Sequence, residues 1–124
     1  MRRRLAEQML QEAVGHFEVV AEYGEADLTD QKTVDAICMR LSAGVEALSG
    51  LEAVEREALF GEVWNQMRGM RNRIAHGYLL VEPAIVASTL ERDVPLVIDI
   101  IKSAIDQLTA GTDPDRPRGP SAGP

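Results

Sequence analysis

Apolar residues recur at intervals of three and four along most of the chain, which is the spacing of an amphipathic helix. The clearest stripe consists of Val34, Ile37, Cys38, Leu41, Val45 and Leu48. Thr29 or Asp30 can cap the start of this helix, which should run to about Leu48, and Ser49-Gly50 should end it. No useful length of sequence alternates apolar and polar residues as a half-buried strand would. The pattern therefore predicts an all-α protein.

The segments before and after this helix show the same periodicity. A first helix should cover Arg2 to Tyr23, with its apolar positions at Leu5, Met9, Val14, Phe17 and Val20. A short helix is expected from Ala53 to Leu59. The next helix should run from about Gly61 to His76, with Gly77 as its C-terminal cap. One face of this segment carries Phe60, Val63, Trp64, Met67, Met70 and Ile74.

The last helix is expected from Pro83, a residue that suits a first helical turn, to about Leu108. Pro95 lies inside this segment and predicts a kink or break, because proline lacks an N–H and its ring clashes with the preceding turn. Residues 111–124 are rich in Gly, Pro, Asp and Arg, and we expect a disordered tail there. The sequence thus predicts one helical domain over residues 1–110, an up-and-down bundle of four to five helices.

Composition agrees with helices and limits the possible functions. Aromatic residues are only 4% of the 124, fewer than a β-sandwich normally carries. The formal net charge is −7, which argues against a protein that coats nucleic acid non-specifically but permits a local basic site. Neither a membrane-length apolar run nor a secretory signal pattern is visible, so a cytoplasmic protein without membrane association is expected.

One short segment concentrates the chemistry-bearing residues. Arg68, Arg71 and Arg73 lie within six positions, Asn72 lies between two of them, and His76 and Tyr78 follow. On an ideal helix Arg71 falls inside the apolar stripe, whereas Asn72 and His76 share another face about 140° away. A straight helix therefore cannot easily aim Arg71 and His76 at one atom. Either the helix loosens near Gly77, or two copies meet across a two-fold axis and share a site.

These residue types suit cleavage of RNA through its own 2′-hydroxyl. Histidine can act as acid or base near neutral pH, and arginine can stabilise the charge of the phosphorane. Neither a metal nor another cofactor is expected, because two distant histidines and one cysteine form no ligand cluster. Single-stranded RNA is the natural substrate, because its backbone can bend into line for internal attack.

Each residue taken alone also has a structural interpretation. His76, at a helix end, could be a capping or surface residue. Arg71 could pair with Glu46 or another buried acid. Tyr78 could lie at the edge of the core.

The ordered combination is more specific. The segment Trp64-Asn-Gln-Met-Arg-Gly-Met-Arg71-Asn72-Arg-Ile-Ala-His76-Gly-Tyr78 resembles the signature R-x-x-x-x-H-x-Y of the HepT-like branch of the HEPN superfamily. Arg71, His76 and Tyr78 match it position for position. Asp30-Gln-Lys-Thr-Val-Asp-Ala-Ile resembles the start of that family's second helix, and Asp93-Val-Pro95-Leu resembles a step in its last one. The resemblance spans roughly Leu5 to Leu108.

The resemblance implies a helical homodimer that acts as a metal-independent endoribonuclease toxin in a type VII-like toxin–antitoxin pair. The site would lie in a cleft at the dimer interface. Arg71 would stabilise phosphate charge, His76 would be the acid–base group, and Asn72, Arg68 and Arg73 would support them. The implied partner is a minimal nucleotidyltransferase antitoxin that attaches AMP to the tyrosine, here Tyr78, and so blocks the anionic substrate site.

Two other interpretations fit the same residues. In the first, the protein is a non-catalytic HEPN module whose cleft binds a nucleotide or holds a partner. In the second, it is a structural helical adaptor in which the motif only closes the dimer. Loss of RNA cleavage without loss of folding in a His76 variant would favour the enzyme.

Overall fold

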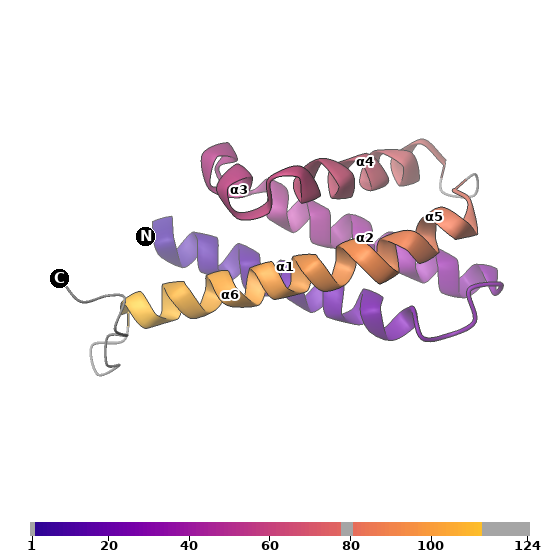
Figure 1. Cartoon of the computed structure of the whole chain (residues 1–124), viewed down its shortest axis with the longest axis horizontal. Coiled ribbons are helices and arrows are strands. Elements are labelled where there is room, and N and C mark those ends of the chain that lie inside the picture. The colour runs from indigo at the N-terminus through magenta and orange to yellow at the C-terminus, as the bar shows by residue number, and fades with distance from the viewer. Residues whose placement is uncertain (1, 78–80, 113–124) are drawn as a thin grey trace.

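The computed structural model describes residues 2–77 and 81–112, and every element in these ranges is helical (Figure 1). Two long helices, α1 (Arg2–Tyr23) and α2 (Gln31–Ser49), form an antiparallel hairpin. Their bounds agree with the ranges that the apolar periodicity predicts. The hairpin is the base on which the remaining helices lie.

The turn between α1 and α2 is held by short polar side chains. Thr29 donates from its backbone N–H and from its hydroxyl to Asp27 Oδ1, at 2.9 and 2.7 Å. The hydroxyl bond and then the backbone bond hold the pKa of the Asp27 carboxyl below its ordinary value. Asp30 is the N-cap of α2 and accepts from the Lys32 backbone N–H at 3.2 Å. The predicted cap is therefore Asp30 rather than Thr29.

The apolar stripe predicted for α2 is buried at all six positions, which confirms it as the central core element. On α1 the prediction holds for Val14, Phe17 and Val20, and Met9 is partly buried. It is wrong for Leu5, which is 48% exposed because it lies near the open end of the first helix. Leu10 and Ala13, on the same α1 face, complete the buried surface.

Two shorter helices cover α2. The first, α3 (Ala53–Phe60), turns at Gly61 with a φ of +53° into α4 (Glu62–Gly77). Arg56 fixes this corner, since its guanidinium lies 4.6 Å from the centre of the Trp64 ring and donates to the carbonyls of Ser49 and Leu51. Phe60, Trp64, Met67 and Met70 are buried toward the core, as the pattern predicts.

The last predicted helix is continuous, but a short segment within it is a π-helix instead of an α-helix. Pro83 is the first residue of α5 (Pro83–Ser88), which continues through a π-helical turn, η2 (Thr89–Asp93), into α6 (Val94–Thr112). The Val94 N–H bonds five residues back to the Thr89 carbonyl. Pro95 supplies the reason, because it has no N–H for the usual bond and needs room for its ring. The expected irregularity at Pro95 thus takes the form of a π turn.

Helices α1, α2, α4 and α6 alternate in direction along the bundle (Figure 1). α6 packs against α1, and α4 packs against α2. This confirms the all-α, up-and-down bundle. Because α6 continues through Gly111 and Thr112, the tail expected over residues 111–124 is wrong for its first two residues. The rest of it lies outside the described residues, and its predicted disorder stays a prediction. None of the helices described is both long and apolar enough to cross a membrane.

Candidate functional site

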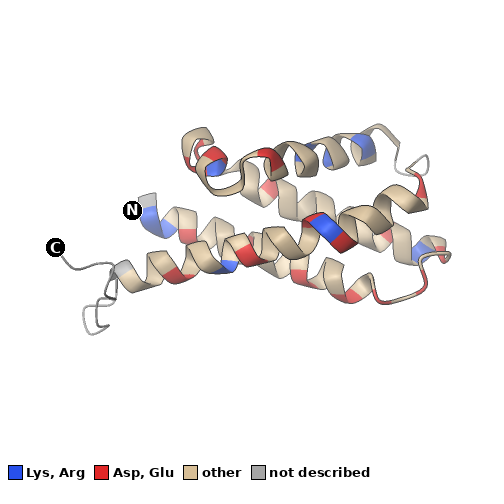
Figure 2. Cartoon of the chain, viewed as in Figure 1, with Lys and Arg blue, Asp and Glu red and all other residues tan. Residues whose placement is uncertain are grey.

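The basic residues singled out by the sequence lie along the second half of α4 (Figure 2). The helix ends at Gly77, whose φ of 143° is in the region that favours glycine. Arg68, Asn72, Arg73 and His76 are exposed, and Arg71 is half-buried. The side chains of this cluster therefore point into solvent from several sides of one helix and do not converge on one site.

Arg71 faces α2, where its guanidinium forms an ion pair with the carboxylate of Glu46. Glu46 is the partner that the structural interpretation of Arg71 names, but it is not a buried acid. The Arg71 side chain is 39% exposed and that of Glu46 is 55% exposed, so the pair lies at the surface. A charged group can occupy the edge of the apolar stripe there because water and a counter-charge both reach it.

His76 lines a pocket on another side of α4, which we call the His76 pocket. Its volume is about 490 Å³, and it is lined by Asn72, Arg73, His76, Gly77, Val81, Glu82 and Ile85. Asn72 and His76 thus share one face, as their spacing of four predicts. Arg71 is not part of the lining. Within one copy of the chain, the cation and the histidine of the motif point to separate places.

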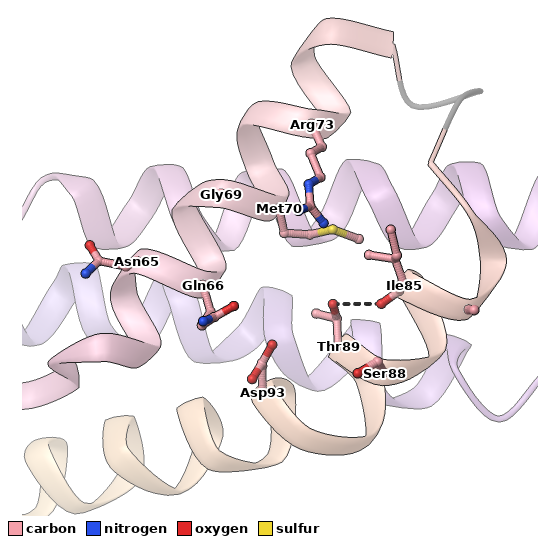
Figure 3. A pocket seen from close by; sticks show the side chains of 10 residues that line it. Asn65, Gln66, Gly69, Met70, Arg73, Ile85, Ser88, Thr89 and Asp93 are labelled. Atoms are coloured by element: carbon pink, nitrogen blue, oxygen red, sulfur yellow. Dashed lines mark hydrogen bonds between the residues drawn. The ribbon is translucent and has the colours of Figure 1, made fainter.

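A second pocket lies beside the first, between α4, α5 and η2 (Figure 3). We call it the Asp93 pocket. It has a volume of about 500 Å³ and is lined by Asn65, Gln66, Gly69, Met70, Arg73, Ala84, Ile85, Ser88, Thr89 and Asp93. Arg73 and Ile85 line both pockets, so the two are neighbours that share a wall.

Gln66 is not among the residues that the sequence singles out, and Asp93 is singled out only through the resemblance of Asp93-Val-Pro95-Leu to the family. A signal was available on α4, since Gln66, Met70 and Arg73 follow each other at spacings of four and three on one face. Nothing local connects that face to Asp93, which is twenty positions further along the chain than Arg73. The packing of η2 against α4 brings them together.

The remaining candidate residues take no visible part in either pocket. Arg68 is exposed and lines neither of them. Tyr78 lies outside the described residues, so its predicted role stays a prediction. The other histidine, His16, lies on α1 with its Nδ1 3.2 Å from an Arg40 guanidinium nitrogen. It belongs to the hairpin rather than to this site.

The described ranges, 2–77 and 81–112, offer no metal site and no reactive thiol. No three His, Cys, Asp or Glu side chains gather there as metal ligands. The thiol of Cys38 is buried in the core. Burial, and secondarily the nearby Asp35 carboxylate, raises the pKa of this thiol, which disfavours the reactive thiolate.

Comparison with known families resolves the general class. The family model described as "Ribonuclease HepT-like" matches residues 9–104, a range that contains both pockets and the whole segment from Trp64 to Tyr78. The chain belongs to the HepT-like ribonuclease family. No curated protein and no solved structure matches it. Membership of the HepT-like family confirms the resemblance drawn from the motif and makes RNA cleavage the activity to which the site should be related.

Proposed function

We propose that this protein is a metal-independent endoribonuclease toxin that cleaves single-stranded RNA in the cytoplasm. The observation that carries the proposal is the coincidence of two findings. The HepT-like match includes the Arg71–His76 motif, and His76 lies with Asn72 and Arg73 in an open pocket of the size that small ligands occupy, roughly 300–1,000 Å³.

In the proposed reaction the 2′-hydroxyl of a nucleotide attacks the adjacent phosphorus. The P–O5′ bond breaks, so that one product ends in a 2′,3′-cyclic phosphate and the other in a 5′-hydroxyl. His76 moves the proton, as acceptor from the 2′-hydroxyl or donor to the leaving oxygen. Arg71 stabilises the negative charge that builds up on the phosphorane. Asn72 orients the substrate, and Arg68 and Arg73 add positive charge along its path.

A second copy of the chain completes the site in this proposal. Arg71 faces α2 through its pair with Glu46, whereas His76 faces the His76 pocket. A two-fold axis beside the end of α4 would bring the arginine of one copy toward the histidine of the other. The RNA phosphate would then compete with Glu46 for the guanidinium. The surface position of that pair supports such an exchange, because exposed ion pairs contribute little free energy.

Regulation by a minimal nucleotidyltransferase antitoxin is part of the same proposal. AMP attached to Tyr78, two residues after His76, would place a negative phosphate where the RNA phosphate binds. Tyr78→Phe should cleave RNA as the wild type does but escape the antitoxin when the two are co-expressed. Continued neutralisation of this variant would contradict modification at Tyr78.

The deciding experiment is cleavage of end-labelled single-stranded RNA in EDTA by the purified full chain. We expect products with 2′,3′-cyclic phosphate ends, and a loss of at least about a hundredfold in rate for His76→Ala, the size of effect typical of a general acid or base. The matched control is His16→Ala, which removes the other histidine. Equal loss in both variants, or unfolding of His76→Ala, would contradict a catalytic His76.

One observation favours a second candidate, a non-catalytic module that binds a nucleotide or holds a partner. Arg71 already has a counter-charge, Glu46, within its own chain. If the folded wild type cuts no RNA in EDTA, the pocket should instead bind a nucleotide, measured by calorimetry, and His76→Ala should weaken that binding.

A further inference from the structure

The Asp93 pocket is lined by a carboxylate, that of Asp93, and by a guanidinium, that of Arg73. Figure 3 shows the Asp93 carboxylate and the Arg73 guanidinium pointing into the same space, Asp93 from η2 and Arg73 from α4. Within residues 2–77 and 81–112 neither forms a hydrogen bond or an ion pair. The neighbouring Thr89 is satisfied, since its hydroxyl donates to the Ile85 carbonyl at 3.0 Å. Asp93 is half-buried and is the last residue of η2.

A carboxylate at this position conflicts with a role in binding phosphate. The Asp93 pocket shares Arg73 and Ile85 with the His76 pocket, where the scissile phosphate is proposed to bind. An acidic group beside that phosphate would weaken RNA binding, and the chain already carries a net charge of −7. The same carboxylate is favourable if it faces the N–H groups of a nucleobase, because charge-assisted hydrogen bonds are the stronger kind.

The four bases differ in what they offer to a carboxylate. The Watson–Crick edge of guanine presents two adjacent donors, N1–H and the 2-amino group, which together match two carboxylate oxygens. Adenine and cytosine each place one amino donor next to a ring nitrogen that is an acceptor, and uracil has one N–H between two carbonyls. The carbonyl oxygen of guanine, O6, in turn needs a donor such as an amide or a guanidinium.

The rest of the lining fits a planar base. Met70 is buried and Ile85 half-buried, and both present apolar surface to the pocket, against which a ring can pack (Figure 3). Gln66 and Arg73 supply amide and guanidinium donors on the α4 side. We propose that the Asp93 pocket binds a guanine base of the RNA substrate, with Asp93 accepting from N1–H and the 2-amino group and Gln66 or Arg73 donating to O6. This inference rests on the proposed ribonuclease function and names its base preference.

The test uses equilibrium binding, so that it does not depend on catalysis. Fluorescent oligouridines carrying one central guanosine, adenosine or cytidine, and an all-uridine strand, are titrated into the full-length His76→Ala protein. The guanosine strand should bind roughly five- to a hundredfold more tightly than the others, as one bidentate base contact gives. Asp93→Asn in the same background should remove the difference, because the amide presents only one acceptor oxygen. Asp106→Asn, an exposed aspartate on α6, is the matched control and should keep it.

Equal affinity for all four strands, absence of binding, or a preference for another base would overturn the inference, and these comparisons need no variant of Asp93. Sequencing of the ends produced by the wild type gives a second readout, in which guanine should be enriched at one fixed position beside the cut. Cleavage without that enrichment would contradict the guanine pocket and leave the ribonuclease proposal intact. Guanosine-selective binding by a protein that cuts no RNA would support the guanine pocket and contradict the ribonuclease proposal.

Discussion

The α1–α2 hairpin and the corner formed by α4, α5 and η2 differ in how closely their side chains pack. In the hairpin the two helices approach so closely that a Cβ on Gly44 would lie 2.8 Å from the Phe17 ring. Phe17, Ile37 and Leu41 there are at most 1% exposed. The corner instead holds two adjoining pockets of about 490 and 500 Å³, lined by both polar and apolar side chains. We therefore expect substitutions in the hairpin to change mainly stability, and substitutions in the corner to change mainly the proposed activity.

The largest effect is expected in the hairpin. Phe17→Ala removes a fully buried ring between α1 and α2 and should lower the free energy of unfolding by about 3–5 kcal/mol, measured by urea denaturation. The protein that remains folded should cleave RNA at the wild-type rate per folded molecule. A normal stability with a lost activity would break the proposed separation of the two regions.

The close contact at Gly44 gives a second, smaller effect. In Gly44→Ala, overpacking against Phe17 should lower the free energy of unfolding by about 1–3 kcal/mol. The higher helix propensity of alanine should offset roughly 1 kcal/mol of this loss. In a Phe17→Ala background the same change should be neutral or stabilising, because the methyl group then has room.

The matched control for Gly44 is Gly15→Ala. Gly15 is an exposed position of α1 with no atom within 4 Å of the added Cβ. This substitution should stabilise the protein through helix propensity alone. If Gly44→Ala behaved as Gly15→Ala does, the close approach of the two helices would be wrong.

The smallest effect on stability is expected where the two regions meet, at the Arg71–Glu46 pair. A double-mutant cycle with Arg71→Ala and Glu46→Ala should give a coupling of about 0.2–1 kcal/mol, because both side chains are well exposed. Arg71→Ala should nevertheless abolish RNA cleavage, whereas Glu46→Ala should keep it. A coupling above about 2 kcal/mol would assign Arg71 a mainly structural role.

The predictions from the sequence are correct where the interactions that decide the structure are local. The stripe of α2, its Asp30 cap and the end of α4 at Gly77 follow from spacings of a few residues, and the structure has all three. The predicted burial of Leu5 was wrong, because periodicity indicates which face of a helix is apolar but not how far the neighbouring helices extend along that face. Pro95 signalled an irregularity without its form, since a π turn depends on which carbonyls the surrounding helix can still satisfy.

The candidate site shows the same division. The motif resembles the family to which the chain belongs. Its spacing also placed Asn72 and His76 on one face, which depends on α4 alone. The incompatibility of Arg71 and His76 on one straight helix also followed from helical geometry, and the structure has them facing different places. That the counter-charge of Arg71 is an exposed glutamate, rather than a buried acid, required the position of α2.

The sequence by itself determined the helices, their order and the residues of the motif, because hydrogen bonds within a helix and the period of its apolar face are set over a few positions. Only the tertiary structure decided that η2 faces α4, that Asp93 and Arg73 share a pocket, and that this pocket adjoins the one at His76. Those relations join segments far apart in the chain. Their distances are fixed by how whole helices pack against one another, which no local pattern specifies.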